Sequence, residues 1–184
     1  GDTRFHIPFI AWYQVMNASL ALTTMEVLKD RIPVTMEQLQ AGIANTRWQG
    51  RMETILPGVI VDGAHNEDGV RRFVETAERF QKEYPLTLLF SAVNDKDYQD
   101  MIHTICSRIK FRKVVTTEVG GYREVPSAEL AEIFCKEGCK DVGNSDNIEE
   151  AFHMAHEAKG EAGMLFCVGS LYLVGEIKTL LLKK

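Results

Sequence analysis

The sequence predicts an α/β fold: a mostly parallel six-stranded sheet with helices on both faces and one antiparallel strand. After Trp48, short apolar stretches typical of strands alternate with longer segments whose apolar residues recur every three or four positions. Such alternation is typical of β–α–β units, which build parallel sheets covered by helices. Pro57 and Gly58 join the first two strand candidates. That connection is too short for a parallel crossover, so these two strands should form an antiparallel hairpin.

Residues 1–46 show no strand pattern and are expected to form a separate helical segment. A helix is predicted over residues 9–28, with apolar residues on nearly all of its sides. Thr35 and Gln38 have the spacing of a capping box, so a second helix should follow and end near Asn45. The first helix has more apolar surface than one short neighbour can cover. We therefore expect this segment to be the remnant of a larger domain.

Residues 47–184 are expected to form the α/β domain itself. The strand candidates are residues 52–56, 58–62, 86–92, 112–117, 164–168 and, most weakly, 140–142. Apolar stripes with helical spacing predict five helices, at residues 70–80, 98–109, 130–134, 148–155 and 171–181.

Composition narrows the class of protein. The 184 residues carry a formal net charge of −5 with dispersed Lys and Arg, which gives no support to a nucleic-acid-binding surface. The longest apolar run is far short of a membrane span, and no signal segment is visible. Cys135 and Cys139 have helical spacing, but no second close cysteine pair completes a metal site. We therefore expect reduced thiols, no metal bound by this chain and a cytoplasmic location.

Three residues near the hairpin have side chains suited to a ligand site. Arg51 precedes the first strand, Asp62 ends the second and His65 lies in the loop that follows. Open α/β sheets bind ligands at the carboxyl ends of their strands. A guanidinium can clamp a phosphate, a carboxylate can bind ribose hydroxyls or a metal, and an imidazole can shuttle protons. The alternatives are a solvated charge for Arg51 and turn or cap roles for Asp62 and His65.

The same loop argues against a dinucleotide-binding oxidoreductase. The motif G-x-G-x-x-G is absent, and the helix opens with Glu67 and Asp68, whose charges would repel a phosphate at that helix end. Asn66 is the expected N-cap. The P-loop pattern G-x-x-x-x-G-K-[ST] does not occur in this sequence either. A nucleotide site that includes Arg51 would need its phosphate cradle from elsewhere.

Lys96 and Ser170 follow two further strands. Lys96 lies beyond strand 86–92, just before the expected N-cap Asp97, and it is placed to bind a substrate carboxylate. Ser170 follows Gly169 at the last strand-to-helix turn, where its hydroxyl could hold a small carboxylate. The alternatives are an exposed loop lysine and a plain N-cap. Parallel strands end on one side, so these two residues should meet Arg51 and Asp62 at a single sheet edge.

Four motifs in order along the chain resemble the C-terminal domain of folylpolyglutamate synthases, which belong to the Mur ligase family. They are residues 46–53 (Thr-Arg-Trp-Gln-Gly-Arg-Met-Glu), 62–66 (Asp-Gly-Ala-His-Asn), 94–97 (Asn-Asp-Lys-Asp) and 169–176 (Gly-Ser-Leu-Tyr-Leu-Val-Gly-Glu). Residues 13–18 (Tyr-Gln-Val-Met-Asn-Ala) resemble the last helical motif of that family's central ATPase domain. The resemblance implies a Rossmann-like Mur ligase C-terminal domain.

The resemblance also implies an activity. The family is an ATP-dependent acid–amino-acid ligase that uses ATP and Mg2+ to join L-glutamate to the γ-carboxylate of a reduced folate, through an acyl phosphate. By position, Gln14 and Asn17 would lie near the adenine, Arg51 would meet the terminal phosphates and Asp62 would bind the nucleotide.

By the same resemblance, His65, Lys96 and Ser170 would face the glutamate or the transferring centre. Arg51 and His65 would be the catalytic residues of the set.

The P-loop, the Mg2+ ligands and most of the folate site belong to an N-terminal domain that this sequence lacks. The chain alone is therefore expected to be inactive. Whether the intact enzyme also acts as a dihydrofolate synthase is left open, because the pterin pocket lies in that missing part. Two alternatives remain: the C-terminal domain of a peptidoglycan Mur ligase, and a non-catalytic α/β binding module.

Overall fold

The computed structural model describes residues 3–121 and 123–182 and divides the chain into two units, Gly1–Gln49 and Gly50–Lys184. The expected boundary lay between residues 46 and 47. Among the described residues, the first unit contains the helices α1 (Tyr13–Val27) and α2 (Met36–Asn45), and the second contains all the strands. That residues 1–46 derive from a central ATPase domain stays a prediction.

The first unit follows its sequence pattern closely. Thr35 caps α2 through the expected capping box: the N–H of Gln38 donates to Thr35 Oγ1 (3.3 Å), and the N–H of Thr35 donates to Gln38 Oε1 (2.8 Å). The helix α1 begins at Tyr13 rather than at residue 9, after a turn at Trp12 that no side chain caps. Without a capping residue the sequence offered no signal for that start.

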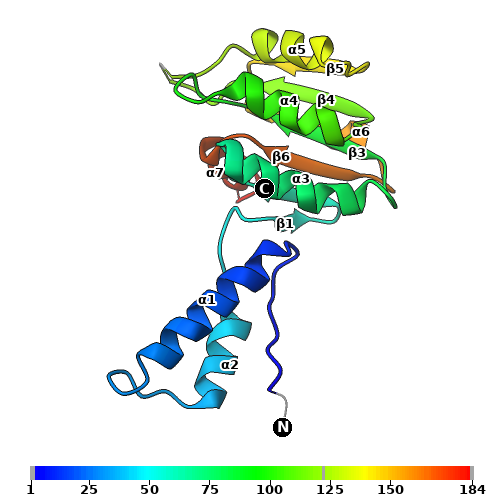
Figure 1. The fold of residues 1–184 in the computed structure, drawn as a ribbon. Coiled ribbons are helices and arrows are strands. Elements are labelled where there is room, and N and C mark those ends of the chain that lie inside the picture. The colour runs from blue at the N-terminus through cyan, green and yellow to red at the C-terminus, as the bar shows by residue number, and fades with distance from the viewer. Residues whose placement is uncertain (1–2, 122, 183–184) are drawn as a thin grey trace. The chain divides into compact units, whose positions relative to one another are not determined.

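The sheet of the second unit has the strand order β1-β2-β6-β3-β4-β5 (Figure 1). The strands β2, β6, β3, β4 and β5 pair in parallel, and only β1 pairs antiparallel, with β2. This confirms the predicted six-stranded sheet with one antiparallel strand. The strands are β1 (Glu53–Leu56), β2 (Val59–Asp62), β3 (Leu86–Phe90), β4 (Lys113–Thr117), β5 (Val142–Ser145) and β6 (Met164–Val168).

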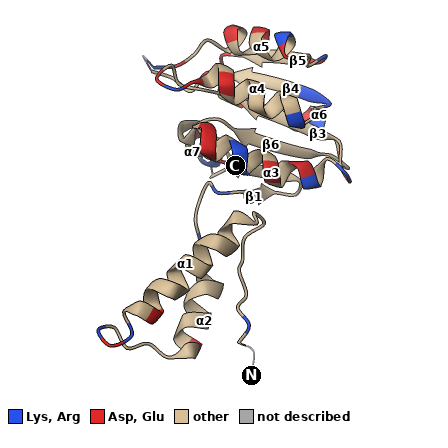
Figure 2. Cartoon of the chain, in the orientation of Figure 1, with Lys and Arg blue, Asp and Glu red and all other residues tan. Residues whose placement is uncertain are grey.

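Helices cover both faces of this sheet (Figure 1). They are α3 (Glu67–Phe80), α4 (Tyr98–Arg108), α5 (Ser127–Lys136), α6 (Ile148–Lys159) and α7 (Leu171–Leu182). The helices α3, α4 and α5 form one layer, and α6 and α7 pack together on the other face. Charged residues lie mainly on the helices and loops of this unit, whereas the central strands are almost free of them (Figure 2).

The core lies on both sides of the central strands. Toward α6 and α7, Val61, Leu89 and Cys167 are fully buried against Phe152 and Ile177. Toward the other layer, edge-on ring contacts join Phe166 of β6 to Phe73 of α3 and Phe90 of β3 to Phe134 of α5. Because strands buried on both faces must be apolar on both, β2 and β3 read as continuous apolar runs rather than alternating ones.

Two strands differ from the sequence expectation by more than one residue at an end. The weak candidate at residues 140–142 is β5, Val142–Ser145, whose Gly-Asn-Ser sequence has little strand propensity and is held by pairing with β4. The candidate at residues 86–92 stops at Phe90. No helix among the described residues is long and apolar enough to cross a membrane.

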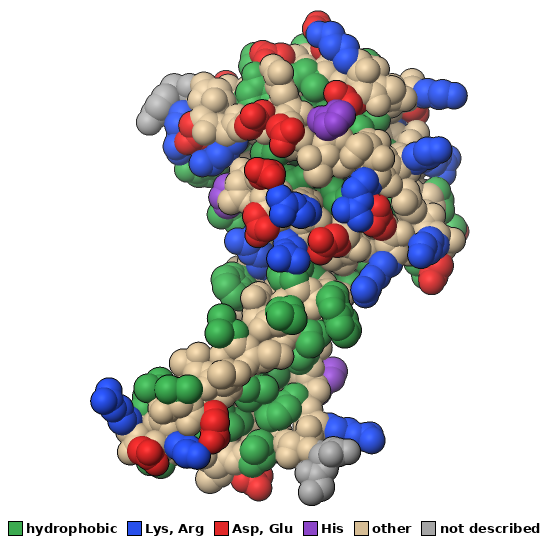
Figure 3. All heavy atoms as spheres, viewed as in Figure 1, with side chains coloured by type: hydrophobic (Ala, Val, Ile, Leu, Met, Phe, Trp, Pro, Cys, Tyr) green, Lys and Arg blue, Asp and Glu red, His purple; other side chains and the backbone are tan. Residues whose placement is uncertain are grey.

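The first unit exposes much apolar surface of its own, as expected from its sequence. In α1, Met16 is 67% exposed, Leu20 68% and Val27 77%, and Glu26 is the only charged residue of the helix. Figure 3 shows apolar side chains along both helices of this unit.

Candidate functional site

The strand register gathers the candidate residues at one edge of the sheet. Asp62 and Phe90 both lie level with Val168, so β2, β6 and β3 end together. Because β1 runs the other way, Glu53 at its start lies level with Val61 near the end of β2. Arg51 therefore lies at the same edge as Asp62, and the loops that carry Lys96 and Ser170 leave from it as well. This is the convergence predicted from the sequence.

Asp62 is the central group of this edge. The N–H of Met52 donates to its Oδ2 and the N–H of Ala64 donates to its Oδ1, each at 2.8 Å. One carboxylate thus ties the turn before β1 to the loop after β2. The side chain is only 3% exposed. A carboxylate has about four lone-pair positions, so each oxygen can still accept one further hydrogen bond.

Burial raises the pKa of Asp62 above its ordinary value of 3.8. The hydrogen bonds from the Met52 and Ala64 amides and the positive charges of Arg51 and His65 act in the opposite direction, but burial dominates. Asp62 therefore loses its proton less readily than an exposed carboxyl group does. A nucleotide or Mg2+ brought to this edge would change that balance.

The turn that presents Arg51 is held on several sides. The N–H of Gly50 donates to Glu53 Oε2 (2.7 Å), and Glu53 also pairs with Lys178 of α7 (2.8 Å). The N–H of Gly63 donates to the carbonyl of Gly50 (2.7 Å). Met52 has a positive φ of 46° although it is not glycine. Such a conformation persists only where the surrounding contacts enforce it. The turn that carries Arg51 is therefore rigid.

His65 has a defined ring orientation. Its Nδ1 lies 2.7 Å from the carbonyl oxygen of Gly63. Since a carbonyl oxygen only accepts, Nδ1 carries the proton of this bond, and in the neutral ring Nε2 is the basic nitrogen. Asn66 caps α3 as expected, accepting from the N–H of Gly69 (2.8 Å).

Lys96 lies in the loop between β3 and α4 with an exposed side chain. Asp97 caps α4, accepting from the N–H of Asp100 at 3.0 Å, as the sequence predicted. The ammonium group therefore reaches solvent from the same sheet edge as Arg51.

Ser170 is the N-cap of α7. Its Oγ accepts from the N–H of Tyr172 (3.1 Å), and the residue is 1% exposed. The structural role is therefore clear, while the hydroxyl proton stays available for donation. Gly169 before it has a φ of 110°, and a Cβ there would lie 2.1 Å from the carbonyl oxygen of Ser91. Only glycine lets the chain leave β6 this close to the end of β3.

Gln14 and Asn17 belong to the first unit. They lie one turn apart on α1, and Asn17 Nδ2 donates to Gln14 Oε1 (2.9 Å). The pair keeps one amide donor group and one amide oxygen for further hydrogen bonds, a combination suited to the edge of a purine base.

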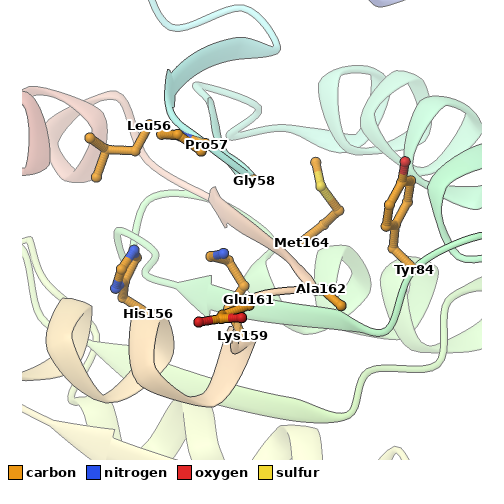
Figure 4. A pocket seen from close by; sticks show the side chains of 10 residues that line it. Leu56, Pro57, Gly58, Tyr84, His156, Lys159, Glu161, Ala162 and Met164 are labelled. Carbon is orange, nitrogen blue, oxygen red and sulfur yellow. The ribbon is translucent and has the colours of Figure 1, made fainter.

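A pocket of about 620 Å3 lies at the opposite edge of the sheet, where the parallel strands begin. Its walls come from the β1–β2 turn, the start of β6 and the end of α6 (Figure 4). Lys159 is the buried cation there, and its Nζ donates to the carbonyl of Gly160 (2.8 Å). The lining is mostly apolar and includes none of the candidate residues. The candidate residues therefore lie at the other edge of the sheet, away from this hollow.

Sequence reasoning missed the residues that support the site. Glu53 and Lys178 meet across 125 positions of the chain, and no local pattern announces such a pair. Among the described residues, no group of three or more acidic, histidine or cysteine side chains could hold a metal ion. These residues alone therefore do not fit a Mg2+ site.

Comparisons with known proteins show the family to which this chain is similar. A family model described as "Mur ligase, glutamate ligase domain" matches residues 50–171. The dihydrofolate synthase/folylpolyglutamate synthase of Bacillus subtilis is 30% identical over 177 residues, which cover 92% of this chain and 39% of that protein. The chain therefore spans about two fifths of the length of this relative.

Solved structures show the same fold. A Mycobacterium tuberculosis folylpolyglutamate synthase complexed with ADP and AMPPCP matches with a TM-score of 0.81 and 26% identity, over 96% of this chain and 41% of that one. A bifunctional folylpolyglutamate synthase/dihydrofolate synthase, solved with Mn, AMPPNP and L-glutamate bound, gives a TM-score of 0.82 over 98% of this chain and 42% of that one. At 19% identity, the second likeness concerns the fold alone.

Proposed function

Because the chain belongs to the Mur ligase family through its glutamate ligase domain, we propose that it supplies part of the ATP and glutamate sites of a folate ligase. The intact enzyme would add L-glutamate to the γ-carboxylate of a reduced folate, at the expense of ATP. One observation carries the proposal: a single sheet edge inside the matched region gathers Arg51, which precedes β1, and Asp62, His65, Lys96 and Ser170, which end or follow parallel strands.

Arg51 would bind the terminal phosphates of ATP. Its planar guanidinium offers several donors, and the rigid turn beneath it holds those donors in place before the nucleotide arrives. Asp62 would accept a hydrogen bond from the nucleotide with a remaining lone pair, while its present bonds keep the Arg51 turn in shape. Gln14 and Asn17 would meet the adenine from the first unit.

The reaction would pass through an acyl phosphate. The folate γ-carboxylate attacks the γ-phosphorus of ATP and releases ADP, and the glutamate amine then attacks the acyl carbon and releases phosphate. Arg51 would stabilise the charge that develops on the transferring phosphoryl group. Nε2 of His65 would accept the proton that the attacking amine must lose.

Lys96 and Ser170 would hold the glutamate. The exposed ammonium of Lys96 is free to approach a carboxylate, and the Ser170 hydroxyl would donate while its oxygen continues to accept from Tyr172. Mg2+ would neutralise charge on the ATP phosphates, and its ligands, like the P-loop and the folate pocket, would belong to an N-terminal domain outside this chain. The unpaired cysteines, including the buried Cys167, fit a cytoplasmic location.

A second activity is proposed on the strength of one relative. The Bacillus subtilis protein is named for both dihydrofolate synthase and folylpolyglutamate synthase activity. Both reactions join glutamate to a carboxylate of a pterin-containing acceptor. The strand edge described here would serve both, since it handles the nucleotide and the incoming amino acid rather than the pterin.

The test is a coupled assay of ADP release with ATP, Mg2+, reduced folate and L-glutamate. We expect the 184-residue chain to show no turnover, because an Arg and an Asp without the phosphate cradle leave most of the transition-state charge unmet. The intact protein should release ADP only when glutamate and folate are both present, and the product should be one glutamate heavier by mass spectrometry. Turnover by the chain alone, or product without added glutamate, would overturn the proposal.

A further inference from the structure

The loop after β4 is joined to the loop that carries Lys96. The N–H of Asn94 donates to the carbonyl of Arg123 (2.7 Å), and the N–H of Val125 donates to the carbonyl of Ala92 (3.3 Å). Val93 and Glu124 form an isolated antiparallel bridge between these bonds. The two loops therefore form a short two-stranded ladder beyond the end of the sheet, at the same edge as the candidate site.

The side chain of Arg123 extends this connection to a third element. Nη1 lies 3.3 Å from Asp95 Oδ2, in the residue directly before Lys96. Nη2 donates to the hydroxyl of Tyr172 (3.0 Å), the second residue of α7 and the one whose N–H is capped by Ser170. One planar guanidinium thus joins the neighbour of Lys96 to the residue that Ser170 caps.

The ion pair between Arg123 and Asp95 is expected to contribute little to the stability of the fold. The side chains of Arg123 and Asp95 are 45% and 42% exposed, and exposed ion pairs contribute little to stability. A guanidinium that bonds two acceptors with two different nitrogens does fix their relative position, because its donors are coplanar. The main effect of the Arg123 contacts is therefore to fix the relative positions of Asp95 and Tyr172, rather than to stabilise the fold.

We propose that Arg123 is a positioning residue that sets the distance between Lys96 and Ser170 and so prepares the glutamate site. The inference rests on the proposed function, since it takes these two residues as the glutamate-binding pair. Lys96 lies on an exposed loop, and ordering such a loop on binding weakens affinity. Arg123 holds the loop in place beforehand and does not itself touch the substrate.

The test uses the intact protein, with steady-state kinetics in glutamate and, separately, in ATP. Arg123→Ala should raise the KM for glutamate by about tenfold, a typical size for the coupling between contacting residues, and leave kcat and the KM for ATP nearly unchanged. Arg123→Lys should be intermediate, because an ammonium can keep the pair with Asp95 but cannot also reach Tyr172 with a fixed fork.

Two further variants separate positioning from direct binding. Tyr172→Phe and Asp95→Asn each remove one acceptor of the guanidinium, so each should raise the KM for glutamate partway. Neither should add to the effect of Arg123→Ala, because all three act through one contact set. Arg108→Ala is the matched control. Arg108 lies at the C-terminal end of α4, its side chain is 42% exposed, and it pairs with Glu78 of α3. The kinetics of this variant should stay at the wild-type values.

The outcomes are distinguishable from failure of the proposed function. If the wild-type protein showed no glutamate-dependent turnover, the function itself would be wrong. If the wild type were active and Arg123→Ala kept the wild-type KM for glutamate, the positioning role would be refuted. It would also be refuted if Arg123→Ala raised that KM while Tyr172→Phe and Asp95→Asn did not, since Arg123 would then bind the substrate itself. Melting temperatures would identify a variant that fails to fold. If Arg123→Ala does not fold, the KM for glutamate of Tyr172→Phe tests the positioning role instead.

Discussion

At the residue scale, the site depends on a buried carboxylate that organises its neighbours. Asp62 accepts from two backbone amides belonging to different loops, and it lies beside Arg51 and His65. In the proposed site, ligand binding and the shape of the two loops would therefore depend on the same group. A substitution at this position would alter both, so kinetics alone would not separate them.

The titration of Asp62 should be visible in stability. Its pKa in the folded chain is raised by burial, so the folded state binds this proton more tightly than the unfolded state does. The resulting stabilisation is present below the ordinary pKa of 3.8 and is lost as pH rises through the folded pKa. In urea titrations, the free energy of unfolding of the wild type minus that of Asp62→Asn should fall with rising pH across this window. A difference that stayed constant or rose with pH would contradict the assignment.

Ser170 has a structural role and a proposed binding role, and two substitutions separate them. Ser170→Ala removes the cap of α7, which should lower stability by about 1 kcal/mol, and should also raise the KM for glutamate in the intact enzyme. Asn147 caps α6 in the same way, accepting from the N–H of Glu150 at 3.0 Å. Asn147→Ala should give a similar stability loss with an unchanged KM. If both variants had the same KM for glutamate, the proposed role of Ser170 in glutamate binding would be wrong.

The sequence predicted which residues lie at the edge but not how they are held there. Arg51, Asp62, Lys96 and Ser170 stand beside strands with clear apolar patterns, so their edge follows from topology. Arg123 lies in a loop with no periodicity, and its partners are 28 and 49 positions away. Such contacts depend on the tertiary fold and have no local signature.

At the scale of elements, the exit from β6 is the most constrained junction. The backbone of Gly169 passes so close to Ser91 that a side chain would overlap a carbonyl oxygen, and its φ of 110° is unfavourable for any other residue. The N-terminus of α7, and Ser170 with it, is placed by this close approach.

Two glycine substitutions in this segment should have opposite effects. Gly169→Ala should destabilise the chain by roughly 3 kcal/mol, through backbone strain and overlap. Gly175→Ala should stabilise it by about 0.5–1 kcal/mol, because Gly175 lies inside α7 with nothing within 4 Å of an added Cβ. Denaturant titration of the 184-residue chain measures both. If Gly169→Ala left the free energy of unfolding unchanged, the close approach of Gly169 to the Ser91 carbonyl would be contradicted.

The helix α1 should promote association when the chain is isolated. Met16, Leu20 and Val27 expose apolar side chains on a helix with one charged residue, and uncovered apolar patches drive association. Sedimentation velocity should show self-association that Leu20→Gln weakens. Leu182→Gln, at an exposed leucine of the other unit, is the control and should change nothing. A monomeric wild type at high concentration would contradict this expectation.

Element boundaries show where local sequence information stops. The capping box of α2 and the caps of α3 and α4 were predicted from side chains within four positions of each other, and all three are present. The start of α1 has no side-chain cap, and β5 has a polar sequence that becomes a strand only beside β4. Pairing and packing with distant segments determine such boundaries.

At the scale of the whole molecule, the chain combines a packed α/β unit with a proposed reaction for which its described residues supply only some of the groups. The sheet edge offers an Arg proposed to bind phosphate, an imidazole proposed to accept a proton and groups proposed to bind a carboxylate, but the described residues provide no metal-binding cluster. The Bacillus subtilis and Mycobacterium tuberculosis proteins are more than twice as long. The proposed ligase therefore needs the remainder of such a protein.

The most direct test of the central claim is the steady-state kinetics of Arg51→Ala in the intact enzyme. The guanidinium should contact phosphate oxygens whose charge redistributes during transfer, so its contribution grows toward the transition state. We predict that kcat falls by roughly a hundred- to a thousandfold, about 3–4 kcal/mol, while glutamate binding weakens far less. An unchanged kcat, or a loss confined to substrate affinity, would contradict the assignment of this strand edge as the site of phosphoryl transfer.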